Sequence, residues 1–286
     1  MEIKTVGVVG AGLMGSGIVE TAARHGYDVI MREVDQTSLE RGRQRIQKSM
    51  SRAVERGKMT DEERNVAQAR IKPTTDLQDL APADLVIEAI IENLGQKKEL
   101  FAAVDKIVSP GVIIASNTSS VSITALAAAT TRQGLVAGMH FFNPVPVMKL
   151  VEIIKALQTT DQTVGTLKTF AGTLDKTIVV AKDTPGFIVN FLLVPYMLDA
   201  VRAVEDDVSS AKDIDTAMTL GTGVPMGPLT LLDFVGLDTT LYIADVMYEE
   251  FKDKKYAAPP LLRKMVAAGY HGKKSGRGFY EYAAKS

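Results

Sequence analysis

Up to about Lys182, short apolar runs rich in β-branched residues alternate with longer amphipathic segments. The runs have the composition of strands, and the apolar residues of the longer segments recur at helical spacing. Strands that alternate with helices imply crossover connections and a mainly parallel sheet with helices on both faces. The predicted strands cover residues 6–9, 28–31, 85–89, 112–115, 135–139, 150–154 and 177–180, and the predicted helices cover 13–25, 36–56, 96–108 and 161–174.

This alternation is interrupted at residues 141–146 and stops after Gly186. The prolines of 141–146 require a loop, and the strand that follows can run back beside the one before it. Beyond residue 186 we expect helices, and no comparable strand before the last few residues. A boundary near residue 185 therefore separates a Rossmann-type domain, 1–185, from a smaller all-α domain, 186–286. The expected helices of the second domain cover 187–204, 211–220, 230–234, 239–251 and 260–268.

Composition and charge exclude several classes of protein. Of the 286 residues 46% are hydrophobic and 23% are charged, which is ordinary for a folded globular protein and too apolar for a disordered one. The 33 basic and 34 acidic residues leave a net charge of −1, so no global field favours nucleic acid or an anionic membrane. The absence of cysteine excludes disulfides, thiolate catalysis and iron–sulfur sites. The three histidines lie far apart in sequence, which argues against a metal site.

The chain shows no targeting segment at its start, because residues 1–4 lead directly into an apolar strand. Residues 187–204 are the most membrane-like stretch, but Asn190, Asp199 and Arg202 interrupt it. We therefore expect a buried core helix there rather than a bilayer span, which needs about 20 mostly apolar residues. The sequence predicts a soluble, cytoplasmic protein.

A glycine-rich turn follows the first strand and opens the first helix. The first glycine permits a tight turn, the second lets the backbone approach a pyrophosphate, and the third lets the helix pack on the strand. Backbone N–H groups and the positive end of the helix dipole then stabilise phosphate charge. The turn is therefore a candidate dinucleotide site, formed by Gly10, Ala11, Gly12, Leu13, Met14 and Gly15.

Glu33 ends the next strand, roughly twenty residues beyond the turn, where the dinucleotide fingerprint expects an acid. A carboxylate there accepts the two ribose hydroxyls of NAD and repels the additional phosphate of NADP. Arg32 beside it could accommodate that phosphate. The pattern favours NAD, and a surface Arg–Glu pair at a strand end is the structural alternative.

The second predicted helix carries a line of cations in a chain that is neutral overall. At about 100° per residue, its basic residues form one stripe and its apolar residues another. The basic stripe suits a polyanionic ligand such as the phosphates of coenzyme A. A solvated helix face that binds no ligand is an equally favoured alternative. Nucleic acid is less favoured, because no aromatic residues interleave with the charges. The stripe consists of Arg45, Lys48, Arg52 and Arg56.

His140 ends an apolar run, and Glu152 interrupts the next predicted strand. A carboxylate buried without a partner is costly, so Glu152 should have a partner or reach solvent. If the second strand folds back on the first, Glu152 can reach His140 and orient it as a general acid–base. A structural histidine is the alternative. The polar run 116–120 follows a buried strand, and Asn190 stands in an apolar helix where it needs a hydrogen-bond partner.

Taken together, these stretches resemble the 3-hydroxyacyl-CoA dehydrogenase family, in particular its short-chain 3-hydroxybutyryl-CoA dehydrogenase members. The resemblance runs nearly end to end, and the blocks around His140 and Asn190 are more specific than the glycine turn. The matching blocks are residues 10–17, 115–120, 138–152, 183–190, 225–228 and 272–280.

The resemblance implies the NAD-dependent, reversible oxidation of an (S)-3-hydroxyacyl-CoA to the 3-oxoacyl-CoA. His140 takes the hydroxyl proton, and Glu152 orients the His140 ring. Ser119 and Asn190 form hydrogen bonds around the reacting oxygen. No metal is implied. Matching positions place Glu33, Glu92, Lys97, Ser119, Asn143 and Lys274 on NAD, in addition to the glycine turn, and Ser49, Arg52, Arg56, Ser119 and Asn190 on the acyl-CoA substrate.

The chain departs from the family pattern at Phe191, where arginine is common, and at Arg56, which replaces a lysine. The resemblance also implies a homodimer formed through the helical domain, and the chain length predicts a monofunctional enzyme. Two alternatives stay open. One is a non-catalytic NADH-binding structural protein of the same fold, like the related lens crystallin. The other is a different two-domain hydroxyacid dehydrogenase, a class that typically uses a catalytic lysine.

Overall fold

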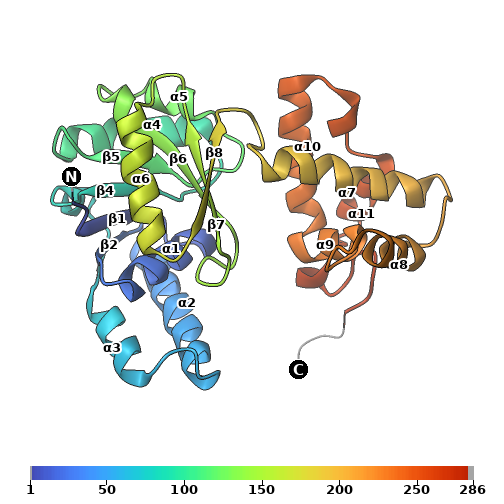
Figure 1. Ribbon diagram of the computed structural model, residues 1–286, viewed down its shortest axis with the longest axis horizontal. Coiled ribbons are helices and arrows are strands. Elements are labelled where there is room, and N and C mark those ends of the chain that lie inside the picture. The colour runs from blue at the N-terminus through green and yellow to red at the C-terminus, as the bar shows by residue number, and fades with distance from the viewer. Residues whose placement is uncertain (1, 283–286) are drawn as a thin grey trace. The chain divides into compact units, whose positions relative to one another are not determined.

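The computed structural model describes residues 2–282. The chain folds into two compact units that divide after Phe187. Figure 1 shows the sheet and its helices in the first unit and the helices of the second. The predicted fold class, a Rossmann-type sheet domain followed by an all-α domain, is confirmed.

The first unit contains an eight-stranded sheet in the order β3-β2-β1-β4-β5-β6-β7-β8. All neighbouring strands run parallel except β6 and β7, which are antiparallel. The strand order reverses between β1 and β4, and such a switch point is where open α/β sheets bind ligands. The strands are β1 Thr5–Val9, β2 Asp28–Arg32, β3 Ile71–Thr74, β4 Leu85–Glu88, β5 Ile113–Ser116, β6 Val136–Phe141, β7 Leu150–Lys155 and β8 Thr177–Lys182.

Helices cover both faces of the sheet. Successive strand residues alternate between the two cores, as Val86 and Ile87 of β4 do, because side chains of a strand point to opposite faces. One core includes side chains of α1, α2 and α6, and the other includes side chains of α4 and α5. The helices are α1 Leu13–Arg24, α2 Gln36–Glu55, α3 Asp61–Ala69, α4 Leu94–Ile107, α5 Ile123–Ala127 and α6 Asp161–Thr173.

Strand β3 and the helices α3 and α5 are not predicted by the apolar pattern of the sequence. Pro73 argues against a strand, yet β3 lies at the edge of the sheet, where a missing N–H is tolerated. Helix α3 is polar with little apolar periodicity, but Thr60 and Glu63 form a reciprocal capping box that marks its start. Helix α5 is only five residues long, too short for a periodic signal.

The second unit is helical around its own apolar core. The predicted helix 187–204 begins later, at Val189, because Gly186 and Phe187 both adopt left-handed backbone conformations. Near the end of the described chain, isolated bridges join Gly272 to Arg277 and Arg277 to Glu281, and no longer strand forms in the described part of this unit. The helices are α7 Val189–Glu205, α8 Ala211–Thr222, α9 Pro228–Val235, α10 Leu237–Phe251 and α11 Pro260–Ala267.

Two buried aspartates hold Phe279 and Tyr280 on this unit. Asp233 accepts hydrogen bonds from the backbone N–H groups of Phe279 and Tyr280, and Asp215 accepts one from the Tyr280 hydroxyl at 2.8 Å. Burial, and then the hydrogen bond to Asp215, raise the pKa of Tyr280 to about 12. Within residues 2–282, no helix has the length and apolarity that a membrane span requires.

Candidate active site

The reversal of the chain between β6 and β7 brings His140 and Glu152 together. The antiparallel register pairs the two residues directly, as predicted if the second strand runs back. His140 Nδ1 lies 2.7 Å from Glu152 Oε2, and the side chains are 8% and 0% exposed. A buried carboxylate is thus paired with an imidazole, which satisfies the requirement that a charge away from water have a partner.

This contact decides which nitrogen of the imidazole carries the proton. A carboxylate only accepts hydrogen bonds, so His140 Nδ1 must be the donor. In the neutral ring Nε2 then carries a lone pair and can accept a proton. The rings of Phe142 and Phe187 lie 4.6 Å and 5.6 Å from the His140 ring, so aromatic surfaces flank the imidazole.

The polar run after β5 lies next to the end of β6. Asn117 Oδ1 accepts a hydrogen bond from the backbone N–H of Phe141 at 2.9 Å, which ties the two strand ends together. Ser119, three positions beyond the end of β5, is half-buried. Ser119 and His140 therefore both lie near the carboxyl ends of two neighbouring parallel strands.

A buried ionic network contacts the backbone of Ser119. Lys97 and Glu88 are each 1% exposed, and Lys97 Nζ donates to Glu88 Oε1 at 2.6 Å and lies 3.0 Å from Glu92 Oε2. Glu92 Oε1 accepts hydrogen bonds from the Thr118 hydroxyl at 2.7 Å and from the backbone N–H of Ser119 at 2.8 Å. The network thus joins the ends of β4 and β5 to α4.

The charge state of Glu92 follows from these contacts. Burial by itself raises the pKa of its carboxyl, but the Lys97 ammonium and the hydrogen bonds from Thr118 and Ser119 lower it more. The pKa of Glu92 is consequently below its usual value, and the side chain is ionised near neutral pH. Lys97 was predicted to contact the cofactor, and its ammonium contacts the two carboxylates, so the direct contact stays a prediction.

The glycine turn lies at the switch point, between β1 and α1. A Cβ on Gly15 would lie 1.8 Å from the Gly10 carbonyl oxygen, whereas a Cβ on Gly12 would meet no atom within 4 Å. Gly10 has a left-handed φ of +100°. There is therefore no room for a side chain at Gly15, whereas the space beside Gly12 is free. In this arrangement the backbone at Gly12 can approach a pyrophosphate.

Glu33 lies beside this turn, at the end of β2. Its Oε1 accepts a hydrogen bond from the Ala11 backbone N–H at 2.7 Å, and its Oε2 accepts one from the Val34 backbone N–H at 2.8 Å. The carboxylate is thus held in place next to the turn. A fixed acceptor at this position fits the ribose of a dinucleotide, and the third glycine and the open second glycine fit its pyrophosphate.

A cleft of about 630 Å³ runs along α1 and α2 and beneath the β6–β7 loop. The predicted stripe of Arg45, Lys48, Arg52 and Arg56 lines it, as do the predicted ligand contacts Ser49 and Asn143. One stripe cation is partly engaged, because an Arg45 guanidinium N–H donates to the Ala11 carbonyl at 3.2 Å.

One buried acid also lines the cleft. Glu20 of α1 is 2% exposed and pairs with Arg24 at 3.2 Å. Burial raises the pKa of Glu20, and the Ser49 hydroxyl and the Arg24 charge oppose that shift. Sequence analysis missed Glu20, although an acid on the apolar face of a helix was a visible signal.

Two models of one protein family match nearly the whole chain. Residues 5–184 match the family model for the NAD-binding domain of 3-hydroxyacyl-CoA dehydrogenase, and residues 186–282 match the model for its C-terminal domain. The chain belongs to the 3-hydroxyacyl-CoA dehydrogenase family. The resemblance seen in the sequence is therefore confirmed, and the protein is an NAD-dependent oxidoreductase of this family whose first unit is the NAD-binding domain.

Individual relatives lie close to this chain. The 3-hydroxybutyryl-CoA dehydrogenase of Mycobacterium tuberculosis (strain CDC 1551 / Oshkosh) is 51% identical over 98% of this chain and 99% of its own. The solved structure of FadB2 from M. tuberculosis has a TM-score of 0.97 at 50% identity, covering 99% of this chain and 100% of that one. The (S)-3-hydroxybutyryl-CoA dehydrogenase of Ralstonia eutropha has a TM-score of 0.94 at 45% identity, with the same coverage.

Three residues singled out in the sequence lie in the second unit. Asn190 is half-buried in the first turn of α7. Lys274 pairs with Asp238 at 2.6 Å. Phe191, where the family commonly has arginine, packs against Phe251 with ring centroids 5.7 Å apart. The contacts of Asn190 with the reacting oxygen and of Lys274 with NAD stay predictions.

Glu88 is the clearest site residue that sequence analysis missed. It accepts hydrogen bonds from Lys97, from the Ile90 backbone N–H at 2.7 Å and from the Ser116 hydroxyl at 2.6 Å. An acid that ends the apolar strand β4 at the switch point was a usable signal. Its partners came from α4 and β5, so its place in the network required the tertiary structure.

Proposed function

We propose that the protein catalyses the NAD-dependent, reversible oxidation of an (S)-3-hydroxyacyl-CoA to the 3-oxoacyl-CoA, with 3-hydroxybutanoyl-CoA and acetoacetyl-CoA as the pair. The observation that carries this proposal is the buried contact of 2.7 Å between His140 Nδ1 and Glu152 Oε2 in a chain of this family. The names of the relatives in M. tuberculosis and R. eutropha support the four-carbon substrate.

His140 is proposed as the acid–base. With Nδ1 donating to Glu152, Nε2 of the neutral ring takes the proton of the substrate hydroxyl and returns it in the reverse direction. The imidazolium that forms lies against the Glu152 carboxylate, which stabilises its charge and keeps the ring from turning. NAD, when bound, supplies the acceptor for the hydride that leaves C3.

The cofactor is proposed to lie over the glycine turn and Glu33. Backbone N–H groups at the start of α1 hold the pyrophosphate, and the Glu33 carboxylate accepts the ribose hydroxyls. Glu92, Lys97, Ser119, Asn143 and Lys274 complete the proposed set of cofactor contacts. We propose NAD rather than NADP because the fixed carboxylate of Glu33 repels an additional phosphate at the ribose.

The coenzyme A portion of the substrate is proposed to occupy the cleft along α2. Ser49, Arg52 and Arg56 supply donors there, and guanidinium groups bind phosphate through paired N–H donors. Ser119 and Asn190 are proposed to bond around the reacting oxygen, which positions it for proton transfer. The Glu88–Lys97–Glu92 network positions Ser119 through its backbone N–H.

We further propose a homodimer formed through the second unit. The exposed apolar side chains of Leu192, Leu220 and Phe234 on that unit support an interface. A monomer mass by sedimentation at micromolar concentration would contradict this. A cytoplasmic location remains a prediction from the sequence.

The decisive experiment follows NADH consumption with acetoacetyl-CoA. We expect turnover by the wild type, severe loss in His140→Ala, and nearly unchanged NADH affinity in that variant. His271→Ala is the matched control, because His271 belongs to the second unit and its ring is hydrogen-bonded to the Val266 carbonyl there. NADH binding without turnover in the wild type would favour the structural, crystallin-like alternative. A rate series from C4 to C10 substrates with NADH and NADPH tests chain length and cofactor preference.

A further inference from the structure

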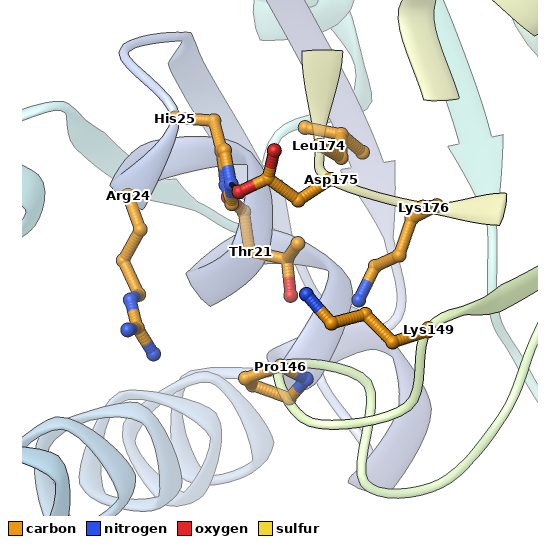
Figure 2. Close-up of a pocket in the computed structure, with 8 residues that line it drawn as sticks. All are labelled: Thr21, Arg24, His25, Pro146, Lys149, Leu174, Asp175 and Lys176. Atoms are coloured by element: carbon orange, nitrogen blue, oxygen red, sulfur yellow. Dashed lines mark hydrogen bonds and ion pairs between the residues drawn. The ribbon is translucent and has the colours of Figure 1, made fainter. Parts of the chain in front are cut away.

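A second, smaller recess adjoins the cleft at the end of α1. It has a volume of about 200 Å³, and three segments of the first unit form it. These are the last turn of α1, the end of the β6–β7 loop and the turn between α6 and β8. Figure 2 shows Lys149 and Lys176 reaching into the recess from the loop and the turn, with Arg24 on its other side. Arg24, Pro146 and Lys149 line both the recess and the cleft, so the two adjoin.

The charges around this recess are not balanced. Arg24 pairs with Glu20 at 3.2 Å, and His25 Nε2 lies 3.5 Å from Asp175 Oδ2. Among the described residues, no carboxylate lies within ion-pair distance of Lys149 or Lys176. Asp175 is the one carboxylate among the residues that line the recess, whereas Arg24, Lys149 and Lys176 supply three cations, so positive charge is in excess there.

Lys176 is held in a fixed position. Its side chain is buried, and Nζ donates to the Val145 carbonyl at 2.6 Å and to the Met148 carbonyl at 2.8 Å. An ammonium has three N–H donors, so one remains for a ligand. Burial, and then repulsion by the positive charge of Lys149, lower the pKa of Lys176, and the neighbouring Asp175 carboxylate opposes this shift. An anion between them would relieve that repulsion.

We propose that this recess binds a phosphate group between Lys149 and Lys176, next to Arg24. A phosphate presents several strong acceptor oxygens, and charge-assisted bonds to ammonium groups are the stronger class of hydrogen bond. Two sources have the same chemistry: a phosphate of the coenzyme A portion lying in the adjoining cleft, or free inorganic phosphate. The first source rests on the proposed function, and the second does not.

The first test is calorimetric titration of the full chain with inorganic phosphate, at constant ionic strength and with NADH present to occupy the dinucleotide site. We expect binding by the wild type and about tenfold weaker binding in Lys149→Ala, since one charge-assisted contact is lost. Lys149→Arg should retain most of the affinity. Lys168→Ala, an exposed lysine of α6 outside the recess, is the matched control and should bind as the wild type does.

The second test compares the KM of acetoacetyl-CoA with that of its 3′-dephospho analogue. A rise in KM of about tenfold in Lys149→Ala for the first thioester only assigns the site to the 3′-phosphate of the substrate. Lost phosphate binding with an unchanged KM for both thioesters assigns it to free phosphate, and an equal rise in KM for both assigns it to the pyrophosphate, which both thioesters carry. Equal phosphate affinity and equal KM values in Lys149→Ala and Lys168→Ala would overturn the proposal. Phosphate binding without turnover of either thioester would sink the proposed function and leave this site standing.

Discussion

Replacing Lys97 by methionine is the sharpest test of the buried network. The substitution keeps most of the side-chain volume but removes the ammonium that lies 2.6 Å from Glu88 and 3.0 Å from Glu92. The Glu88 carboxylate, 1% exposed, would keep its hydrogen bonds from Ile90 and Ser116 and lose its only cation in the described structure. A buried charge that loses its partner cannot be screened by water at this depth.

The expected loss is large for a single substitution. Removing one partner of a buried ion pair costs about 3–5 kcal/mol, because the other charge stays buried without compensation. Both partners here are almost completely buried, so solvent does not reduce this value. For a unit of this size each kcal/mol lowers Tm by about 2–4 °C, and the first unit should therefore melt roughly 6–20 °C lower.

The assay is urea unfolding followed by circular dichroism, with calorimetry for Tm. Lys98→Met is the control, because Lys98 is the exposed neighbour of Lys97 on the same helix. The double variant Glu88→Gln/Lys97→Met removes both charges and should be more stable than Lys97→Met alone. Equal stability of Lys97→Met and Lys98→Met, or a double variant less stable than the single one, would refute the reasoning.

Three further predictions concern single groups. Glu152→Gln should lower turnover about 10²- to 10⁴-fold with NADH affinity kept, because an amide can hold the wrong tautomer of His140; unchanged turnover would contradict the orienting role. The lowered pKa of Glu92 means that its contribution to stability is present above about pH 4.3 and is lost as the pH falls through the folded-state value. In Glu92→Gln the free energy of unfolding should therefore fall less steeply as the pH is lowered. The same pH dependence as in the wild type would contradict this prediction. The pKa of Tyr280 is raised to about 12, so its contribution to the free energy of unfolding is complete below about pH 10 and is lost between about pH 10 and pH 12. Tyr280→Phe should remove this loss of stability at alkaline pH, as measured by urea unfolding.

The local features of the chain could be predicted from the sequence because their physics is local. The glycine turn requires small residues at three fixed spacings, and strands and helices follow from apolar periodicity, so the Rossmann-type domain and the helical domain were both foreseen. Where local signals were weak or misleading, prediction failed. Pro73 argued against a strand where the edge strand β3 forms. Helix α7 begins after the predicted residue 187, because Phe187 has a left-handed backbone conformation.

The contacts of the site were decided by the tertiary structure. The sequence left open whether Glu152 reaches His140, and only the antiparallel register of β6 and β7 places the two residues opposite one another. The partners of Lys97 likewise come from β4 and from the segment after it, and the recess beside Arg24 joins three segments of the first unit that are distant along the chain. Local patterns encode what a segment becomes, whereas the pairing of distant side chains depends on how the segments pack, which no local pattern specifies.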